Sequence, residues 1–426
     1  MRHSSRTTDN SASVMVFGVG PFTQSTMRIL REAGARVSAY LTRSYGHYGP
    51  SLEGPVYDAG IQATPFRALA AQQPGLIVPM SIEWALAPWT AEFLQRGVPI
   101  LCPTGEGLLL ERERDFARGL CRRFSIPFPD AHCARNRAEA LGILARNGRP
   151  YVIKNPLCSP FSPIHTIVCE TSEETGSWLE RVDDREGIFL QEFLGRAEVG
   201  HIAVVSAGEV HSLVTNQEYK RAFDGNLGIV AGAPLGGLVE RDPDDRYGLA
   251  RELIHPLAPW FRAVNFHGPV QVTAMRHRRR WHVLEYNVRL GVTSSAMILR
   301  LLANPLDVLR SVALNQSPSP RFRPGLRFGC SLTLAGYGYP YTSLEGPRVP
   351  VRLQAKPTCD VWWGEVALGP DRNLWATGHR VADVVALAGT LEGAIRRAYA
   401  NIRRLECLGS YYRRDIGRSL WPPGSL

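Results

Sequence analysis

One apolar segment of the sequence places two oxygen ligands of the metal-binding kind close together. Residues 281–291 read WHVLEYNVRLG, and Glu285 and Asn287 are two positions apart within it. Because side chains alternate between the two faces of a β-strand, both would lie on one face of a sheet. A carboxylate and an amide oxygen are hard ligands, which suit Mg²⁺ carried in with nucleotide phosphates. Arg289 lies on the same side if the strand continues, where its charge could stabilise a phosphoryl group in transfer.

A second segment could complete this ligand set. Residues 268–275 read GPVQVTAM, and an Arg-rich run at 276–280 separates them from the first segment. We expect the two segments to pair as strands and the run to be their hairpin turn rather than a nucleic-acid patch. Gln271 would then supply a third oxygen, with Thr273 on the same face as the competing candidate. The alternative is an exposed polar pair with no ligand, and the two-residue pattern taken alone favours that alternative.

The surrounding pattern predicts several domains of mixed α/β and α+β structure. Near the N-terminus, apolar runs alternate with helical stretches and predict an open parallel sheet. These runs lie at 14–20, 35–41, 75–80 and 98–104. A helical segment and a small α+β unit follow, then mostly strands from 198 to about 320, and a tail that ends in a helix. We expect domains at 13–108, 109–195, 196–322 and 323–426.

Composition narrows the function classes. The chain of 426 residues is 44% apolar and 21% charged, which is ordinary for a globular protein. No run of 18 apolar residues suggests a membrane span, and the polar first dozen residues do not read as a secretion signal. Eight cysteines without a CxxC pair indicate reduced thiols in the cytoplasm. The net charge is +10, but no basic face with interleaved aromatics predicts nucleic-acid binding.

Four motifs, in the same order, resemble those of the phosphoribosylamine–glycine ligases of purine synthesis, which are ATP-grasp enzymes. LEYNVRLG at 284–291 resembles their IEFNCRFG, and NQEYKR at 216–221 resembles their SQDHKR. CPT at 102–104 resembles their GPT, and the C-terminal RAYANIRRLECLGSYYRRDIG resembles their RAYA…CRKDIG. The resemblance spans nearly the full length. It implies an ATP-grasp fold with an N-terminal parallel-sheet domain, a small lid subdomain and a C-terminal mixed domain.

The resemblance also implies roles for individual residues. ATP phosphates would be bound by Lys154 and by Arg114, which replaces a lysine and so keeps the charge with a different geometry. The remaining roles are a hinge lining the adenine (Gln191, Glu192, Phe193, Leu194), a carboxylate for the ribose hydroxyls (Glu198), magnesium ligands (Glu285, Asn287) and basic residues at an acyl-phosphate site (Lys220, Arg221, Arg289). The implied reaction uses ATP and Mg²⁺, or Mn²⁺, to phosphorylate a carboxylate, and an amine then attacks the acyl phosphate. We expect small-molecule substrates and a cytoplasmic monomer or homodimer.

Several segments depart from the resembled family where its substrates bind. We call four of them the rewritten segments: 18–25 (GVGPFTQS), 79–83 (PMSIE), 227–234 (LGIVAGAP) and 290–296 (LGVTSSA), the last of which lacks an acidic pair. The loop at 155–165, glycine-rich with a lysine in the family, has three prolines and no lysine here. Proline has no N–H to offer a phosphate, although Ser159, Ser162 and His165 could compensate.

These departures lead to three hypotheses. The first is an ATP-dependent carboxylate–amine ligase with an amino acid as one substrate, in a specialised-metabolite pathway. The second is a true phosphoribosylamine–glycine ligase. The third is a non-catalytic ATP-binding protein whose lid has degenerated.

Overall fold

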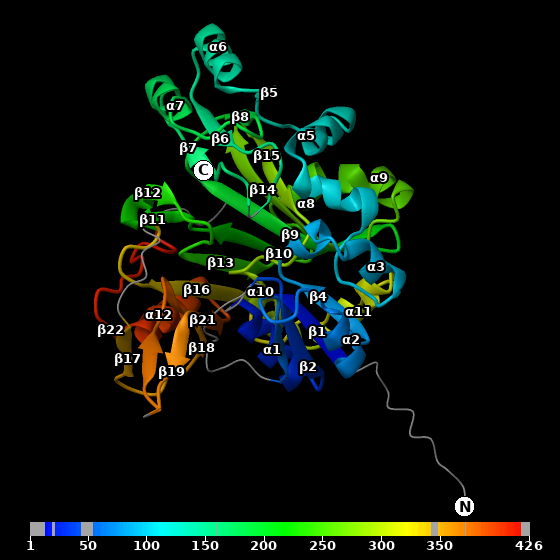
Figure 1. Cartoon of the computed structure of the whole chain (residues 1–426), viewed down its shortest axis with the longest axis vertical. Coiled ribbons are helices and arrows are strands. Elements are labelled where there is room, and N and C mark those ends of the chain that lie inside the picture. Colours follow the sequence, from blue (N-terminus) through cyan, green and yellow to red (C-terminus); the bar gives the residue numbers. More distant parts are fainter. Residues whose placement is uncertain are drawn as a thin grey trace, which may run out of the picture.

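The computed structural model of the chain describes residues 13–18, 22–43, 54–159, 161–341, 348–370 and 372–418 (Figure 1). None of the helices in this described part is long and apolar enough to cross a membrane.

The N-terminal part forms the parallel sheet that the sequence predicts. Its strands follow the order β3-β2-β1-β4, and every pairing is parallel. The strands are β1 (Ser13–Gly18), β2 (Arg36–Leu41), β3 (Val56–Asp58) and β4 (Leu76–Pro79), with helices α1 (Thr23–Glu32), α2 (Phe66–Gln72), η3 (Glu83–Leu86) and α3 (Thr90–Gln95). The strand expected at 98–104 forms only one parallel bridge, between Ile77 and Ile100. Pro99 and Pro103 cannot donate to a ladder, which explains why this strand stays short.

A small unit follows, with a sheet and an apolar cluster of its own. The short helix η4 (Gly105–Leu108) comes first. The helical segment expected from 109 is then split into α4 (Leu109–Arg112) and α5 (Arg114–Arg123), because Glu113 between them is extended. The sheet order is β5-β8-β6-β7. Its elements are β5 (Ala131–Ala134), α6 (Arg137–Asn147), β6 (Tyr151–Lys154), β7 (Ile167–Val168), α7 (Ser172–Leu179) and β8 (Ile188–Glu192). Tyr151, Ile153, Leu179 and Leu190 share its core.

The largest sheet is antiparallel and has eight strands in the order β15-β14-β9-β10-β13-β16-β21-β18. They are β9 (Glu198–Ser206), β10 (Glu209–Glu218), β13 (Gly236–Arg241), β14 (Gly268–His277), β15 (Arg280–Asn287), β16 (Phe328–Ala335), β18 (Asp360–Trp363) and β21 (Arg380–Ala388). Two smaller sheets are also present. One pairs β11 (Arg221–Phe223) with β12 (Leu227–Val230), which η5 (Asp224–Asn226) connects, and the other has the strand order β19-β20-β17-β22. The latter strands are β17 (Val349–Leu353), β19 (Val366–Leu368), β20 (Leu374–Ala376) and β22 (Leu405–Cys407). The large sheet contains strands from both sides of the domain boundary expected at residue 322. The limits of the expected domains stay predictions.

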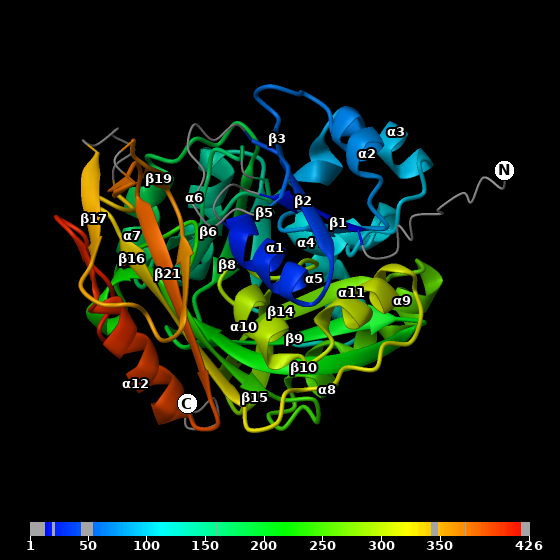
Figure 2. The ribbon, with the colours of Figure 1, turned by 90° about the horizontal axis from the view of Figure 1, so that it is seen from below.

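Helices cover both faces of the large sheet. Ile202 and Val204 share an apolar cluster with α1 and α10, whereas Ala203 and Val205 pack with α8 and α9 on the other face. The remaining helices are α8 (Leu249–Leu253), η6 (His255–Leu257), α9 (Ala258–Ala263), α10 (Ser295–Leu301), α11 (Pro305–Ala313) and α12 (Leu391–Ile402). Figure 2 shows α10 and α11 between the N-terminal sheet and the large sheet, with α12 beside β21. The α1 and α10 helices are thereby placed against strands that come much later in the chain.

The Arg-rich run is a hairpin turn, as the sequence predicts. β14 ends at His277 and β15 begins at Arg280. The two residues between them, Arg278 and Arg279, have φ of 48° and 66°. Positive φ at both central residues is the geometry of a two-residue turn that matches the twist of its strands. The turn fixes the register from His277 opposite Arg280 to Ala274 opposite Val283. A shift of one residue beyond that point places Thr273 opposite Glu285 and Gln271 opposite Asn287.

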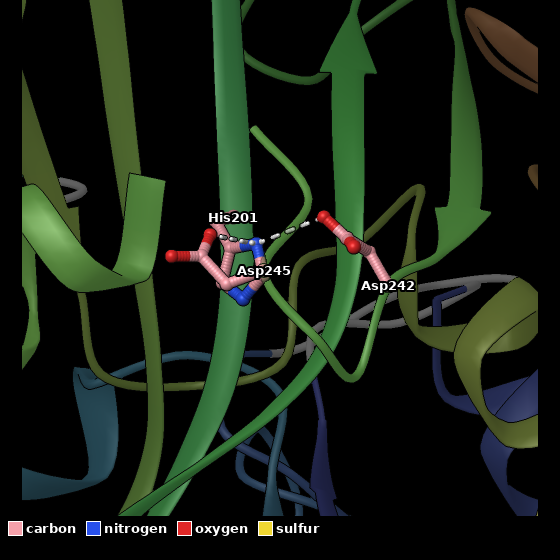
Figure 3. Close-up of side chains that lie close together, drawn as sticks. All are labelled: His201, Asp242 and Asp245. Carbon is pink, nitrogen blue, oxygen red and sulfur yellow. Dashed lines mark ion pairs between the residues drawn. The ribbon is translucent and has the colours of Figure 1, made fainter. Parts of the chain in front are cut away.

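A buried polar network lies on the large sheet (Figure 3). His201 Nδ1 is 3.9 Å from Asp242 Oδ2, 3.8 Å from Asp245 Oδ1 and 3.0 Å from Thr215 Oγ1. Thr215 donates its proton to Asp242 at 2.7 Å, so the imidazole carries its proton on Nδ1. The other carboxylate oxygens accept backbone N–H groups of Arg246, Ala250 and Arg251. Every carboxylate oxygen of this group is thus already hydrogen-bonded within the chain, and we assign the group a structural role.

This network predicts acid sensitivity of folding. Burial lowers the pKa of His201, and this effect outweighs the charges of Asp245 and Asp242, which act in the opposite direction. The folded chain therefore holds a neutral imidazole, while the unfolded chain takes up a proton as the pH falls below about 6.5. We expect His201→Gln to lose less of its thermal stability than the wild type between pH 8 and pH 5.5, measured as Tm by calorimetry. His267→Gln, at the surface, serves as the control. An equal loss in both variants would rule out this role of His201.

Candidate active site

A bulge in β15 shapes the candidate metal site. Thr273 pairs with Glu285 but Ala274 pairs with Val283, which leaves Leu284 without a partner in the ladder. Beyond the bulge, Tyr286 is in the apolar core, while Glu285 and Asn287 lie on the opposite, polar face. The expected shared face of these two residues is therefore present. The free carbonyl of Leu284 accepts hydrogen bonds from two residues of the small sheet, Lys154 Nζ at 3.3 Å and Gln191 Nε2 at 3.2 Å.

Lys220 is the centre of an ionic cluster. Its Nζ lies 3.0 Å from Glu198, 3.2 Å from Glu285 and 3.9 Å from Glu218. Arg114 approaches the second oxygen of Glu285 at 3.6 Å. Burial alone would raise the pKa of the Glu285 carboxyl, but Lys220, Lys154 and Arg114 hold that pKa well below its usual range. Glu285 is therefore ionised at any pH at which the protein works.

Lys154 is buried within the same cluster. Burial, together with the charges of Arg114 and Lys220, lowers its pKa to about 8, against the opposing effect of Glu285 and Glu198. Its ammonium is thus charged at neutral pH and easily deprotonated above it. A desolvated point charge beside a second cation, Arg114, is a suitable arrangement for binding a polyphosphate.

Arg289 is held by a residue that the sequence analysis missed. Glu111 of α4 is buried, and its two oxygens contact Arg289 Nε at 3.3 Å and accept the Val288 N–H at 2.6 Å. Arg289 also donates to Asn287 Oδ1 at 2.8 Å. Glu111 is a positioning residue, because it fixes the guanidinium next to the metal face. The only signal in the sequence was a carboxylate within an apolar helical run.

A second carboxylate, Glu218, also escaped the sequence analysis, although it lies in the NQEYKR motif. A side chain at Gly291 would approach Glu218 Oε1 at 3.6 Å and Gln271 Oε1 at 3.1 Å, so these two oxygens converge at a glycine. The oxygens of Gln271 and Thr273 are both buried without a hydrogen-bond partner in the described part of the chain. Unpaired buried oxygens beside carboxylates fit a hard cation such as Mg²⁺.

The residues expected to line the nucleotide are partly brought together. Gln191 and Glu192 end β8, and Phe193 and Leu194 begin the connection to β9. Gln191 faces Leu284, while Glu192 pairs with Arg149 at 3.2 Å on the small unit. Glu198 is bonded to Lys220. The nucleotide roles of all these residues stay predictions.

Arg221 is placed apart from the cluster. Its guanidinium donates to the Gly228 carbonyl at 2.9 Å and pairs with Glu170 at 3.1 Å. The first contact lies within the β11–β12 ribbon, and the second joins this ribbon to the small unit next to β7. The catalytic role expected of Arg221 stays a prediction.

The loop at 155–165 is tied to the linker helices. The Arg114 N–H donates to the Pro156 carbonyl and the Cys158 N–H to the Arg112 carbonyl. Ser162 is buried and hydrogen-bonded to Asn155 and Leu157, so its hydroxyl serves the loop and not a phosphate. Pro160 lies outside the described residues, as do Val19, Gly20 and Pro21 of the first rewritten segment.

Sequence comparisons find proteins that are similar to this chain. Residues 329–419 match the family described as "Phosphoribosylglycinamide synthetase, C domain". A phosphoribosylamine–glycine ligase of Leifsonia xyli is 29% identical over 335 residues, 76% of this chain and 79% of the relative. That of Ralstonia nicotianae is 27% identical over 343 residues, with the same shares covered.

Solved structures show the fold. A phosphoribosylamine–glycine ligase from Thermotoga maritima superposes with a TM-score of 0.76 at 24% identity, covering 95% of this chain and 100% of the other. Biotin carboxylase from Campylobacter jejuni superposes with a TM-score of 0.68 at 12% identity, covering 94% and 93%. The chain therefore has the ATP-grasp fold, as the sequence resemblance implied.

Proposed function

We propose that this chain, an ATP-grasp ligase similar to phosphoribosylamine–glycine ligases, activates a small carboxylate with ATP and joins it to an amine. The observation that carries the proposal is the ionic cluster on β15. There, ionised Glu285 meets Lys220 at 3.2 Å and Arg114 at 3.6 Å, and Lys154 is buried beside them. Cations and carboxylates in one partly buried site are what phosphoryl transfer to a carboxylate requires.

Each part of the site supplies one component of this chemistry. Glu285, Asn287, Gln271 and Glu218 would hold Mg²⁺, which neutralises phosphate charge when bound. Lys154 and Arg114 would bind the ATP phosphates. Glu111 orients Arg289 so that its charge stabilises the phosphoryl group in transfer. Lys220 is bonded to Glu198 and Glu285, and we infer that nucleotide entry exchanges these contacts for contacts to phosphate. No covalent enzyme nucleophile is needed.

Phosphoribosylamine and glycine are the substrate pair to test first, because the curated relatives are named for it. This pair corresponds to the second of our three sequence hypotheses. No comparison supports the specialised-metabolite pathway. The rewritten segments favour a second candidate, in which another amino acid or amine replaces one member of the pair. That the protein acts in the cytoplasm, as a monomer or homodimer, stays a prediction.

An ADP-release assay tests the proposal. Purified protein with Mg-ATP is offered glycine with phosphoribosylamine and, separately, pools of amino acids and amines, with Glu285→Gln as the matched variant. We expect one combination to release ADP well above the variant, and Mn²⁺ to replace Mg²⁺. If ATP binds but no combination releases ADP, the chain is the non-catalytic ATP-binding protein of our third hypothesis. If ATP does not bind, the ligase proposal is wrong.

A further inference from the structure

A groove lies between helix α12 and the chain segment that follows β22. Figure 2 shows α12 at the outer edge of the molecule, beside β21. The free volume of the groove is about 460 Å³, which lies within the range of sites that hold a small organic molecule. One face of α12 forms the first wall, since Glu392, Arg396, Tyr399 and Arg403 are spaced three or four residues apart. Residues 412–418 supply the second wall.

The groove is strongly basic. Among the described residues, four guanidinium groups line it and a single carboxylate, that of Glu392, accompanies them. All four arginines are exposed, and they are Arg396, Arg403, Arg414 and Arg418. Arg403 donates from Nε to the Tyr399 carbonyl at 2.9 Å. The guanidinium groups of the other three have no hydrogen bond or ion pair with any residue that the structure describes.

A neighbouring arginine shows the contrast with a paired side chain. Arg413 is buried, and its Nε and Nη2 donate to the carboxylate of Asp415 at 2.9 and 2.6 Å. A single exposed arginine without such a partner is simply solvated, but four that line one hollow repel one another and raise the local positive potential. An anion in the groove would relieve this repulsion. The charge of the groove therefore indicates an anionic ligand.

The aromatic rings of the groove narrow the class of anion. The ring centroids of Tyr399 and Tyr412 are 6.2 Å apart. The Tyr399 hydroxyl donates to the Arg413 carbonyl at 2.9 Å and accepts the Ile416 N–H at 3.1 Å, so this ring is held in place. Ile395 adds an apolar side chain. An inorganic anion would leave this apolar surface uncovered, whereas a phosphate ester that carries a planar ring would contact both the rings and the guanidinium groups.

We propose that this groove is a binding site for a nucleotide, that is, a phosphate ester joined to a planar ring. Arg396 and Arg414, one from each wall, bind the phosphate, and Tyr412 packs against the ring. This inference goes beyond the proposed function and does not rest on it. Helix α12 packs against β16 and β21, whereas Glu285 of the ionic cluster lies on the edge strand β15.

Equilibrium dialysis of the full chain against labelled AMP tests the site, in about 0.15 M chloride so that loosely held anions are screened. Arg396→Gln combined with Arg414→Gln removes one charge from each wall. We expect the affinity of the groove for AMP to fall about a hundredfold or more, so that this double variant binds one AMP per chain fewer than the wild type. Its Tm should stay within about 2 °C of the wild type, because both side chains are exposed.

Arg278→Gln combined with Arg279→Gln is the matched control. It removes two exposed arginines from the β14–β15 turn, so it lowers the net charge of the chain by the same amount. We expect this control to bind as many AMP molecules per chain as the wild type. A loss of one AMP in the control as well would make the effect one of overall charge and would overturn the site.

The ring and the phosphate are tested separately with two further probes. Adenosine carries only the ring and inorganic phosphate only the anion, and we expect each to bind the groove at least about tenfold more weakly than AMP. Binding to the groove is measured as the binding that the double variant at Arg396 and Arg414 loses. Tyr412→Leu should weaken AMP about fivefold to a hundredfold and leave inorganic phosphate unchanged, because it removes only a ring contact.

The outcomes decide both the site and the class of ligand. An equal number of bound AMP molecules in the wild type and in the double variant at Arg396 and Arg414 would overturn the site. If inorganic phosphate binds as tightly as AMP, the groove holds an inorganic anion only and the nucleotide assignment is wrong. A single-stranded oligonucleotide of about 15 residues that binds there more than about a hundredfold tighter than AMP would assign the groove to nucleic acid instead. None of these measurements uses ADP release, so a failure of the ligase proposal would leave their result standing.

Discussion

Glu285→Gln is expected to lower kcat by about 10²- to 10³-fold, because it removes a carboxylate that faces Lys220, Arg114 and Lys154 together. The amide keeps the shape but loses the charge, so a divalent cation is held more weakly and three cations lose their shared counter-ion. Steady-state ADP release at saturating Mg-ATP measures the effect. We also expect the variant to need more Mg²⁺: the Mg²⁺ concentration that gives the half-maximal rate should be at least tenfold higher than in the wild type.

Glu240→Gln is the matched control for Glu285→Gln. Glu240 is 1% exposed and pairs with Arg246 and Arg327, so its substitution also removes a buried carboxylate from between cations. It touches none of the residues of the ionic cluster described above. We expect it to lower Tm and to leave kcat within about threefold of the wild type. If Glu285→Gln keeps kcat within the same range, β15 does not carry the metal site.

The alternation of side chains and the turn residues were sufficient to predict the two strands that carry Glu285 and Asn287. The hairpin of β14 and β15 follows from alternation and a two-residue Arg turn, which by itself would pair Gln271 with Tyr286. The bulge at Leu284 shifts the register by one residue and pairs Gln271 with Asn287, and nothing in the segment VLEYN indicates an unpaired residue. That bulge supplies the carbonyl which binds Lys154 and Gln191. Period-two reasoning therefore placed Glu285 and Asn287 on one face, but it missed the register shift that brings Gln271 opposite Asn287 and the backbone acceptor at Leu284.

Long-range contacts account for most of what the sequence analysis missed. Glu111 contacts Arg289 across more than 170 positions, and only the folded chain shows that a residue of α4 lies under β15. Asp383 and Phe22 are even further apart, yet both line one small recess beside α1. Motif comparison finds residues that match a familiar string, and none of these three belongs to one. Arg221 does lie in a matching motif, and in the folded chain it pairs with Glu170, so its role at the acyl-phosphate site stays a prediction.

Lys154→Met is expected to lower kcat/KM for ATP about tenfold to a hundredfold, because it removes a buried ammonium from the phosphate side of the cluster. The wild type should also show a pH limb. With its pKa lowered to about 8, Lys154 is charged below that pH and neutral above it. Since kcat/KM reports the free enzyme, it should be constant below pH 8 and fall as the pH rises through about 8. Initial rates at low ATP between pH 6.5 and 9.5 measure this.

Lys154→Arg separates this ammonium from other groups that titrate. A guanidinium stays charged throughout the range, so the fall above pH 8 should disappear even if the absolute rate drops because of its different shape. Lys220 cannot cause the limb, because Glu198, Glu285 and Glu218 outweigh burial and raise its pKa far above this range. A limb near pH 8 that persists in Lys154→Arg would therefore assign it to another group and remove Lys154 from the phosphate site. A limb that vanishes would mean that the charge on this one buried lysine determines how tightly the free enzyme captures ATP.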